Sequence, residues 1–511
     1  MIKKVIIFSE NNGDHFNFMK SASSLRLSYM LRKEGYQVKQ VHNCLSFTAD
    51  EIGKIVDKFS EGEEVLACIS TSFINTINRK NILNLPGSES DPTNAPVGSF
   101  WGTETYDFLI RTLSLLKDRN IKVLVGGWEV NEHKFKIPKL RNAWGIDELS
   151  KNVDYFIIGN SIDIIVKATR NETIEFQNHK GSRLVYGEDI SDFTDCASTP
   201  LLEDNISMGE SLSTEIAAGC IFSCQFCNYA ALGKKKTEYM RTYESLEREI
   251  ISNYENFKTR VYLFTDNIMN DYDEKLKFLI RIREKTGIDL RWAGYLRADT
   301  IKNKDQARLI AESGVAGATF GIESLKKESG PYIGKMTDKP KVLKSLDIFR
   351  EAVGENCVVT GSFIAGLPTE TEKEVFSTFK WLQSDEGANL IDNYTFSTLT
   401  IFDTNKDKNS INSSRNDPFK DYVINGSPSD WTSPWGSSAM YAELAKYFNK
   451  ERKSRINGFS PPFLHNMGLD IENVVKLGRM HSQENENRVY AMLSSKKESL
   501  IQGYKDKLLR V

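Results

Sequence analysis

Three of the seven cysteines lie within eight residues, in the segment Cys220-Ile-Phe-Ser-Cys224-Gln-Phe-Cys227. The segment follows an apolar run, Leu212–Ala217, that is typical of a strand. A turn that carries three thiolates at these gaps can direct them to one point, which suits a soft metal centre. Zinc would need a fourth protein ligand or a water, whereas an iron–sulfur cube on three cysteines leaves one iron free for a small molecule. Three buried thiols without a metal are the remaining interpretation, and it gives no reason for the tight spacing.

Other residues with chemical capacity come directly after later predicted strands. Glu323 and Ser324 end the strand Phe320-Gly-Ile-Glu-Ser324, where they could bind a ligand or, for Ser324, cap the following helix. Arg297 follows another strand, and its planar guanidinium could bind a carboxylate or form a surface ion pair. Asp266 ends a third strand and could accept hydrogen bonds. Gly366, in Gly-Leu-Pro-Thr-Glu-Thr371, would let the backbone approach a ligand, or it forms only a strand-to-helix turn.

The elements that position these residues alternate between strands and helices. Six β-branched or apolar runs are predicted strands: Leu212–Ala217, Val261–Phe264, Asp289–Tyr295, Ala316–Gly321, Cys357–Ile364 and Tyr394–Ile401. Amphipathic helical patterns lie between them, around 241–256, 272–286, 303–313, 338–351 and 370–384. This order predicts a partial (β/α)6 barrel of the TIM type over residues 211–403, with its chemistry at the carboxyl ends of the strands.

The first 170 residues show a similar alternation. Predicted strands are Val5–Phe8, Val38–Val41, Val65–Ile69, Val123–Val125 and Tyr155–Ile158, with helical patterns around 20–34, 49–59, 104–118 and 161–169. The pattern predicts an α/β domain with a doubly wound parallel sheet of the Rossmann or flavodoxin type over 1–170. Residues 84–102 are expected to form a long loop, 171–210 a surface connector, and 404–511 a helical carboxy-terminal region.

Composition excludes several classes of protein. The chain has 511 residues, 67 Lys and Arg against 69 Asp and Glu, and 40% hydrophobic residues, which is typical of a soluble protein with several domains. The near-zero net charge gives no indication of nucleic-acid binding along the surface. No apolar run is long enough for a membrane span or a signal peptide, and seven sparse cysteines do not resemble a disulfide framework. We therefore expect a cytoplasmic protein without a membrane partner.

The cysteine segment resembles the signature of the radical S-adenosylmethionine superfamily, Cys-x₃-Cys-x₂-Cys after the first barrel strand with an aromatic residue, here Phe226, before the last cysteine. The resemblance implies a [4Fe–4S] cluster on Cys220, Cys224 and Cys227, whose unique iron binds S-adenosylmethionine. Reductive cleavage would give a 5′-deoxyadenosyl radical that abstracts hydrogen from a substrate. An electron donor such as flavodoxin or ferredoxin is then an implied partner, and the substrate, small or macromolecular, stays unknown.

The same resemblance assigns cofactor-binding roles to the other residues. Phe226, Arg297, Glu323 and Ser324 would help to hold the cofactor, since a Gly-x-Glu-Ser in the family contacts S-adenosylmethionine. Asp266 stands where many relatives have Gly-Gly-Glu, and would accept the same hydrogen bonds from the methionine amino group. The Gly366 segment resembles Gly-Leu-Pro-Gly-Glu-Thr of the cobalamin-type and methylthiolating branches, with Thr369 in place of the usual glycine.

An α/β domain ahead of such a barrel resembles the cobalamin-binding domain of class B members. Gly126-Gly127 and Gly159-Asn-Ser are similar to loops that hold the nucleotide tail there. The axial-histidine motif Asp-x-His-x-x-Gly is missing, since Asp14 and His15 are adjacent. The domain therefore either binds cobalamin without a histidine ligand or serves packing or substrate binding.

These observations together predict a radical S-adenosylmethionine enzyme of class-B-like layout. Its reaction would begin with hydrogen abstraction and could end in methylation. The alternative is a binding protein that zinc or an iron–sulfur cluster stabilises and that performs no catalysis.

Overall fold

The computed structural model describes residues 1–10, 19–72, 74, 103–127, 130, 146–179, 181–187, 193–222, 224–227, 240–335, 338–401, 419–427, 429–452, 454, 456–479 and 483–510. They divide into two compact units. The first contains Met1–Met208, Glu255–Phe257 and Leu493–Val511, and the second contains Gly209–Tyr254 and Lys258–Met492. The loop expected at 84–102 lies outside the described residues.

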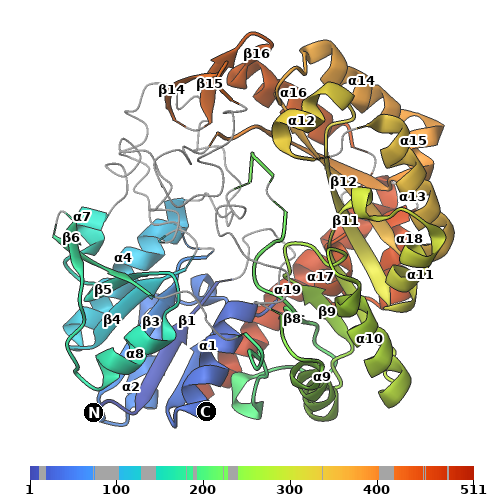
Figure 1. Ribbon diagram of the computed structural model, residues 1–511. Helices are drawn as coiled ribbons and strands as arrows, with labels where there is room; N and C mark the ends of the chain where they lie inside the picture. Colours follow the sequence, from blue (N-terminus) through green and yellow to red (C-terminus); the bar gives the residue numbers. More distant parts are fainter. Residues whose placement is uncertain are drawn as a thin grey trace. The chain divides into compact units, whose positions relative to one another are not determined.

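The first unit is built on a seven-stranded sheet of order β2-β1-β3-β4-β5-β7-β6 (Figure 1). Its strands are β1 (Lys4–Phe8), β2 (Gln37–Val41), β3 (Val65–Ser70), β4 (Lys122–Gly126), β5 (Tyr155–Ile158), β6 (Gln177–His179) and β7 (Ser182–Tyr186). All neighbours pair in parallel except β6 and β7, which form an antiparallel hairpin. The five predicted strands are confirmed. Residues 177–186, expected within a connector, instead extend the sheet.

Helices cover both faces of this sheet. They are α1 (Ala22–Lys33), α2 (Ala49–Ser60), α4 (Thr103–Asp118), α7 (Ile146–Leu149) and α8 (Ile162–Thr169). Val5 and Ile7 share one buried cluster with Leu31 of α1 and Ile165 of α8. Side chains alternate between the faces of a strand, so Ile6 and Phe8 point to the opposite face, where α2 packs against β1 and α4. The doubly wound arrangement is confirmed.

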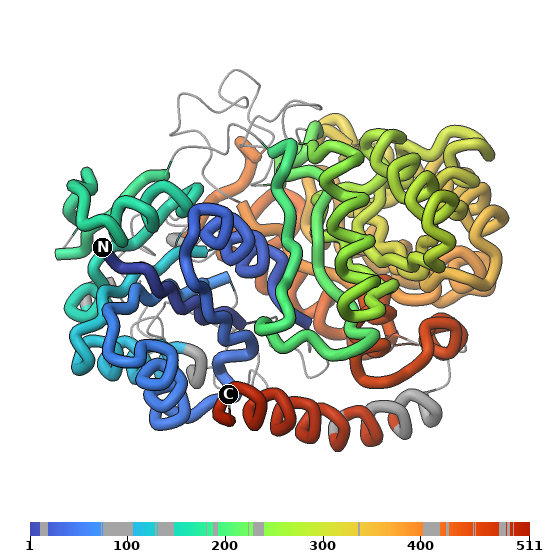
Figure 2. The backbone as a smooth tube through the Cα atoms, turned by 90° about the horizontal axis from the view of Figure 1, so that it is seen from below, coloured from blue at the N-terminus to red at the C-terminus, as the bar shows by residue number. Residues whose placement is uncertain are grey.

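The end of the last helix, α19 (Gln483–Arg510), packs within the first unit (Figure 2). The backbone N–H of His42 donates to the Tyr504 hydroxyl at 2.9 Å, and the Tyr504 ring meets Phe47 edge-on. Lys505 forms an ion pair with Glu51 at 2.7 Å. This unit is therefore assembled from parts that are far apart in the sequence.

The second unit contains a six-stranded parallel sheet of order β13-β12-β11-β10-β9-β8, with β8 and β13 at its two edges. Its strands are β8 (Leu212–Thr214), β9 (Val261–Phe264), β10 (Arg291–Leu296), β11 (Val315–Glu323), β12 (Val358–Ala365) and β13 (Asn393–Thr398). The connecting helices are α9 (Tyr243–Phe257), α10 (Asp273–Thr286), α11 (Lys304–Glu312), α12 (Gly330–Ile333), α13 (Lys339–Val353), α14 (Glu372–Gln383) and α15 (Asp385–Leu390). The predicted partial barrel is confirmed.

One face of this sheet is covered by helices, and the other lines the interior of the partial barrel. The Trp292 indole donates to the Ser313 carbonyl behind β10, and Phe320 packs edge-on against Phe349 of α13. Because side chains alternate, Tyr295, Arg297 and Thr319 point into the interior. In a parallel sheet whose strands are connected by helices, such residues lie together at the carboxyl ends of the strands.

The region after β13 differs from the expectation of a helical segment. It contains a three-stranded antiparallel sheet, β14 (Val423–Ser427), β15 (Asp430–Ser433) and β16 (Gly436–Ser437), before α16 (Ser438–Lys450), α17 (Ser460–Asn466) and α18 (Ile471–Arg479). The helical character of this region was predicted correctly, and the short polar strands were not predicted. None of the described helices is long and apolar enough to cross a membrane.

Candidate functional site

The cysteine segment begins six residues after β8 ends, and a buried carboxylate binds the backbone between the two. Both oxygens of Asp266 accept backbone N–H groups, from Ile216 at 2.8 Å and from Ala217 at 2.9 Å. Lys275 lies 3.1 Å from the same carboxylate. Burial raises the pKa of Asp266, although the Lys275 ammonium opposes this effect. Asp266, expected to bind the cofactor, therefore has protein partners on both oxygens and positions the cysteine segment.

The described cysteines lie on a tight turn near the barrel mouth. The Cys227 N–H donates to the Cys224 carbonyl at 3.1 Å, and the Gln225 N–H donates to the Ile333 carbonyl at 3.0 Å. Burial raises the pKa of the Cys220 thiol, and Asp271 and the two neighbouring thiols act in the same direction. Three cysteines on one turn are the donor set that a cationic metal centre would stabilise as thiolates.

The thiols do not meet at a single point. Among the described residues, no three His, Cys, Asp or Glu side chains form a group that could hold one metal ion. A cube places a different demand on its ligands, since each thiolate binds a separate iron. The assignment of Cys220, Cys224 and Cys227 to a cluster stays a prediction, which the chemistry of the donor set fits.

Arg297 reaches the cysteine turn from the end of β10. Its Nη1 donates to Cys224 Sγ at 3.2 Å, and its guanidinium lies 3.8 Å from the centre of the Phe222 ring. Its Nε donates to Asp299 Oδ1 at 2.8 Å, and its Nη2 binds the other oxygen of that carboxylate. The side chain is buried. The expected surface ion pair is therefore excluded, and the carboxylate partner of Arg297 belongs to the protein.

Glu323 and Ser324 lie at the carboxyl end of β11, as predicted. Glu323 is buried, and Lys335 Nζ donates to its Oε1 at 2.8 Å. Its φ of +69° is unusual for a residue other than glycine, and such strain is common at functional sites. The Ser324 hydroxyl donates to Glu370 Oε1 at 2.6 Å and accepts the Lys326 N–H at 3.0 Å. This contact is a local turn and not the helix cap that was the alternative role of Ser324, because the short helix Lys327–Ser329 has Lys326 as its N-cap residue and no side-chain cap.

Glu370 is a buried acid that sequence reasoning did not select. Its second oxygen, Oε2, is buried without a hydrogen-bond partner among the described residues. Burial raises the pKa of Glu370 to about 8, against the opposing effect of the Ser324 hydrogen bond. Thr369 beside it has a φ of +69°, a conformation that glycine adopts without strain. The position of Glu370 in the Leu-Pro-Thr-Glu motif was the available signal.

Gly366 is approached closely, but by aromatic side chains. Its φ is +91°, and an added Cβ would lie 2.5 Å from the Trp431 ring and 2.9 Å from the Tyr441 ring. The Tyr422 hydroxyl donates to the Gly366 carbonyl at 2.8 Å. The expectation of a ligand at Gly366 is corrected here, because residues from β15 and α16 occupy that space. Phe226 lies half-buried on the cysteine turn, and its cofactor role stays a prediction.

The interior face of the barrel is accessible toward the carboxyl ends of the strands. Half-buried or exposed residues occur at alternate positions opposite the helices, namely Leu263, Tyr295, Gly321, Ser362, Ile364, Thr395 and Ser397. Deeper in the barrel, Gly458 lies against Gly317 and donates its N–H to Thr360 Oγ1 at 2.8 Å. Phe459 meets Tyr295 edge-on at 4.5 Å. The residues after α16 thus fill the lower interior, and the more accessible side chains lie toward the carboxyl ends of the strands.

Tyr295 is a second residue that sequence reasoning missed. It is 45% exposed although it lies in a central strand. It precedes Arg297 by two residues, so both side chains point into the barrel. That spacing was the signal that could have found it.

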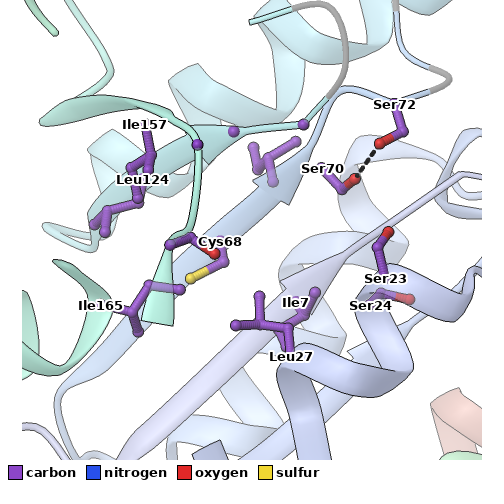
Figure 3. A pocket seen from close by; sticks show the side chains of 15 residues that line it. Ile7, Ser23, Ser24, Leu27, Cys68, Ser70, Ser72, Leu124, Ile157 and Ile165 are labelled. Carbon is purple, nitrogen blue, oxygen red and sulfur yellow. Dashed lines mark hydrogen bonds between the residues drawn. The ribbon is translucent and has the colours of Figure 1, made fainter. Parts of the chain in front are cut away.

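A cavity of about 280 Å³ lies in the first unit, at the carboxyl ends of β1, β3, β4 and β5 (Figure 3). Gly126, Gly127, Gly159 and Ser161 are among its lining residues, as expected for the two predicted loops. Apolar side chains, including Ile7, Leu124, Ile157 and Ile165, line one part of the cavity, and the hydroxyls of Ser23, Ser24, Ser70 and Ser72 gather at the other. An added Cβ at Gly127 would lie 2.7 Å from the Thr71 nitrogen, which explains the glycine.

The chain is similar to known proteins in both parts. The family model of the radical SAM superfamily matches residues 214–382. An uncharacterized methyltransferase of Pyrococcus horikoshii, PH0819, is 28% identical over 163 residues, which are 32% of this chain and 34% of that protein. The chain thus spans about a third of the length of this curated relative.

Two solved structures share the fold over most of the chain. The radical S-adenosylmethionine methyltransferase TsrM from Kitasatospora setae superimposes with a TM-score of 0.55 at 16% identity, over 78% of this chain and 74% of that one. The cobalamin-dependent S-adenosylmethionine radical enzyme OxsB gives a TM-score of 0.53 at 15% identity, over 75% of this chain and 52% of that one. Residues 214–382 are a radical S-adenosylmethionine domain, and over most of the chain the fold, an α/β domain followed by a partial barrel, is similar to that of these two structures.

Proposed function

We propose that this radical S-adenosylmethionine enzyme transfers a methyl group with the help of a cobalamin in its first unit. The observation that carries the proposal is the cavity at the carboxyl ends of β1, β3, β4 and β5, which coexists with a three-cysteine turn in the barrel. A barrel with a cluster alone accounts for radical chemistry, and the additional ligand cavity supports a second cofactor.

Different residues of the barrel would hold the [4Fe–4S] cluster and S-adenosylmethionine. Cys220, Cys224 and Cys227 would bind a [4Fe–4S] cluster, which supplies an electron to S-adenosylmethionine when both are bound. Glu323, held by Lys335, and the Ser324 hydroxyl lie at the strand end where the cofactor's polar groups are expected. Phe226 would shield the cluster from water.

The cavity in the first unit has the chemistry for the nucleotide tail of cobalamin. We expect a planar heteroaromatic ring to pack on Leu27, Leu124 and Ile157, with its polar atoms bound by the serine hydroxyls. TsrM has been solved with cobalamin and a [4Fe–4S] cluster bound, and OxsB with aqua-cobalamin. Both observations concern those proteins, and they support the same assignment here. A domain retained for substrate binding or packing is the competing role.

A cytoplasmic location and a low-potential electron donor such as flavodoxin or ferredoxin belong to this proposal. None of the seven cysteines, all of which lie in the described part of the chain, forms a disulfide, which accords with a reducing compartment. A cluster also needs a reductant before each cleavage of S-adenosylmethionine. A binding protein without catalysis is not favoured, since the similar proteins are named as methyltransferases or radical enzymes.

Products of S-adenosylmethionine test the enzymatic part of the proposal. The full chain is reconstituted anaerobically with iron and sulfide, supplied with cobalamin, reduced with dithionite and mixed with S-adenosylmethionine. We expect 5′-deoxyadenosine from reductive cleavage or S-adenosylhomocysteine from loss of the methyl group. Neither product above the level of a Cys224→Ala variant would refute the proposal.

Cobalamin binding is tested separately at the cavity. Leu27→Trp places a large ring inside the cavity from α1, and we expect at least a tenfold loss of affinity for cobalamin, measured by its visible spectrum after gel filtration. Met30→Trp is the matched control, because Met30 is partly buried on the same helix and packs on the same core without lining the cavity. Equal affinities of the two variants and the wild type would refute the assignment of the cavity.

A further inference from the structure

Arg297 presents only one of its edges to the cysteine turn. Its Nε and Nη2 both bind the Asp299 carboxylate, which uses the bidentate edge of the guanidinium. Its Nη1 points to Cys224 Sγ at 3.2 Å. The bidentate edge is therefore not available for the carboxylate of S-adenosylmethionine. The remaining N–H group, on Nη1, points to the Cys224 sulfur.

The surroundings hold the guanidinium in this orientation. The Asn270 side chain exchanges two hydrogen bonds with the Arg297 backbone, accepting its N–H at 2.8 Å and donating to its carbonyl at 2.9 Å. The Phe222 ring covers one face of the guanidinium at 3.8 Å. Arg297 is 3% exposed. Because the Arg297 guanidinium is buried and held in place, it loses little conformational entropy when it binds the Cys224 sulfur. Its hydrogen bond to this sulfur is therefore preorganised.

We infer that Arg297 sets the reduction potential of the cluster through its hydrogen bond to Cys224. The inference rests on the proposed function, because it requires a cluster on Cys220, Cys224 and Cys227. Reduction adds one negative charge to the cluster, and a cationic donor on a ligand sulfur stabilises the more negative state. Arg297 therefore raises the potential, so that a mild cellular donor can reduce the cluster.

Asp299 limits this effect. Its carboxylate neutralises the net charge of the guanidinium, and it lies on the edge away from Cys224. Removing its charge leaves the positive guanidinium without a counterion in a buried site, where charges interact strongly. Two substitutions within one ion pair should thus move the potential in opposite directions, which a purely structural role for Arg297 would not produce.

The test is a redox titration of the reconstituted full chain, followed by the electron paramagnetic resonance of the reduced cluster. For Arg297→Gln we expect a lower potential, with about a tenfold smaller ratio of reduced to oxidised cluster at the wild-type midpoint, or about 59 mV for one electron. Arg297→Lys keeps the charge but loses the fork, and we expect a smaller decrease. For Asp299→Asn we expect an increase.

Arg350→Gln is the matched control, because Arg350 pairs with Asp392 at the amino-terminal ends of β12 and β13. We expect its potential to equal that of the wild type. Unchanged potentials in the iron-loaded Arg297 and Asp299 variants would overturn the inference. Loss of iron from Arg297→Gln, Arg297→Lys and Asp299→Asn alike would also overturn it, because Arg297 would then have a structural role. If only Arg297→Gln loses its iron, the directions in which the reduction potential shifts in Arg297→Lys and Asp299→Asn decide the outcome. A wild type without any cluster signal would instead overturn the proposed function.

Discussion

Glu370→Gln should change how the stability of the barrel depends on pH. Glu370 is buried, its Oε1 accepts the Ser324 hydroxyl at 2.6 Å, and burial raises its pKa from 4.5 to about 8. The folded protein therefore keeps this proton where the unfolded chain has released it. The stability that this proton contributes is complete below pH 4.5 and is lost progressively as the pH rises through about 8.

The pKa difference sets the size of the effect. At about 1.4 kcal/mol for each pH unit, the interval from 4.5 to about 8 corresponds to an upper bound of about 5 kcal/mol. Between pH 6 and pH 9 this single group should cost the wild type about 2–3 kcal/mol of unfolding free energy. Glutamine has nearly the same shape, accepts the same hydroxyl and does not ionise. The difference between variant and wild type should therefore grow by that amount across the interval.

The assay is urea unfolding of the full chain at pH 6, 7, 8 and 9, followed by the fluorescence of the buried tryptophans. The two units need not unfold together, so the midpoint of the barrel transition is compared between proteins. Glu374→Gln is the control, because hydrogen bonds from Lys326 and Thr371 lower the pKa of Glu374 in spite of its partial burial. Its contribution is lost only as the pH falls. Parallel pH profiles of wild type and Glu370→Gln would refute the reasoning.

Two further substitutions test the supports of the site. Asp266→Asn leaves the buried Lys275 with Asp271 as its remaining counterion, and we expect about 1–3 kcal/mol lower stability in urea and less iron bound per chain after reconstitution; full iron retention would contradict its positioning role. Gly366→Ala should lower the thermal midpoint far more than Gly287→Ala, because both have positive φ but only Gly366 faces the Trp431 ring at 2.5 Å; equal losses would show that the ring moves aside freely.

The core of each unit could be predicted because its strands are continuous apolar runs between amphipathic helices. Val5, Val65 and Val261 all begin such runs, and burial on both faces leaves no other arrangement for them. The missed strands have the opposite character. Residues 177–179 and 430–433 are short and polar, and their strand form depends on pairing with neighbours. Such pairing has no local signal.

The candidate site was predicted at the level of residue types and strand ends, but not of partners. Arg297 and Glu323 lie at the barrel mouth as expected, yet their contacts with Cys224 and Lys335 join residues that the sequence separates. Gly366 illustrates the limit best. A glycine in a sequence indicates that another group lies close to the backbone, and only the folded structure identifies that group as the Trp431 ring.

The packing of Tyr504 and Lys505 against residues 42–51 has a consequence for biosynthesis. These contacts from the last helix complete the packing of the first unit. The ribosome synthesises the entire barrel before residues 493–510. The nascent α/β domain must therefore wait with part of its surface uncovered, since contacts so distant in sequence form late. Chaperone binding during translation should concentrate on this uncovered patch around Phe47.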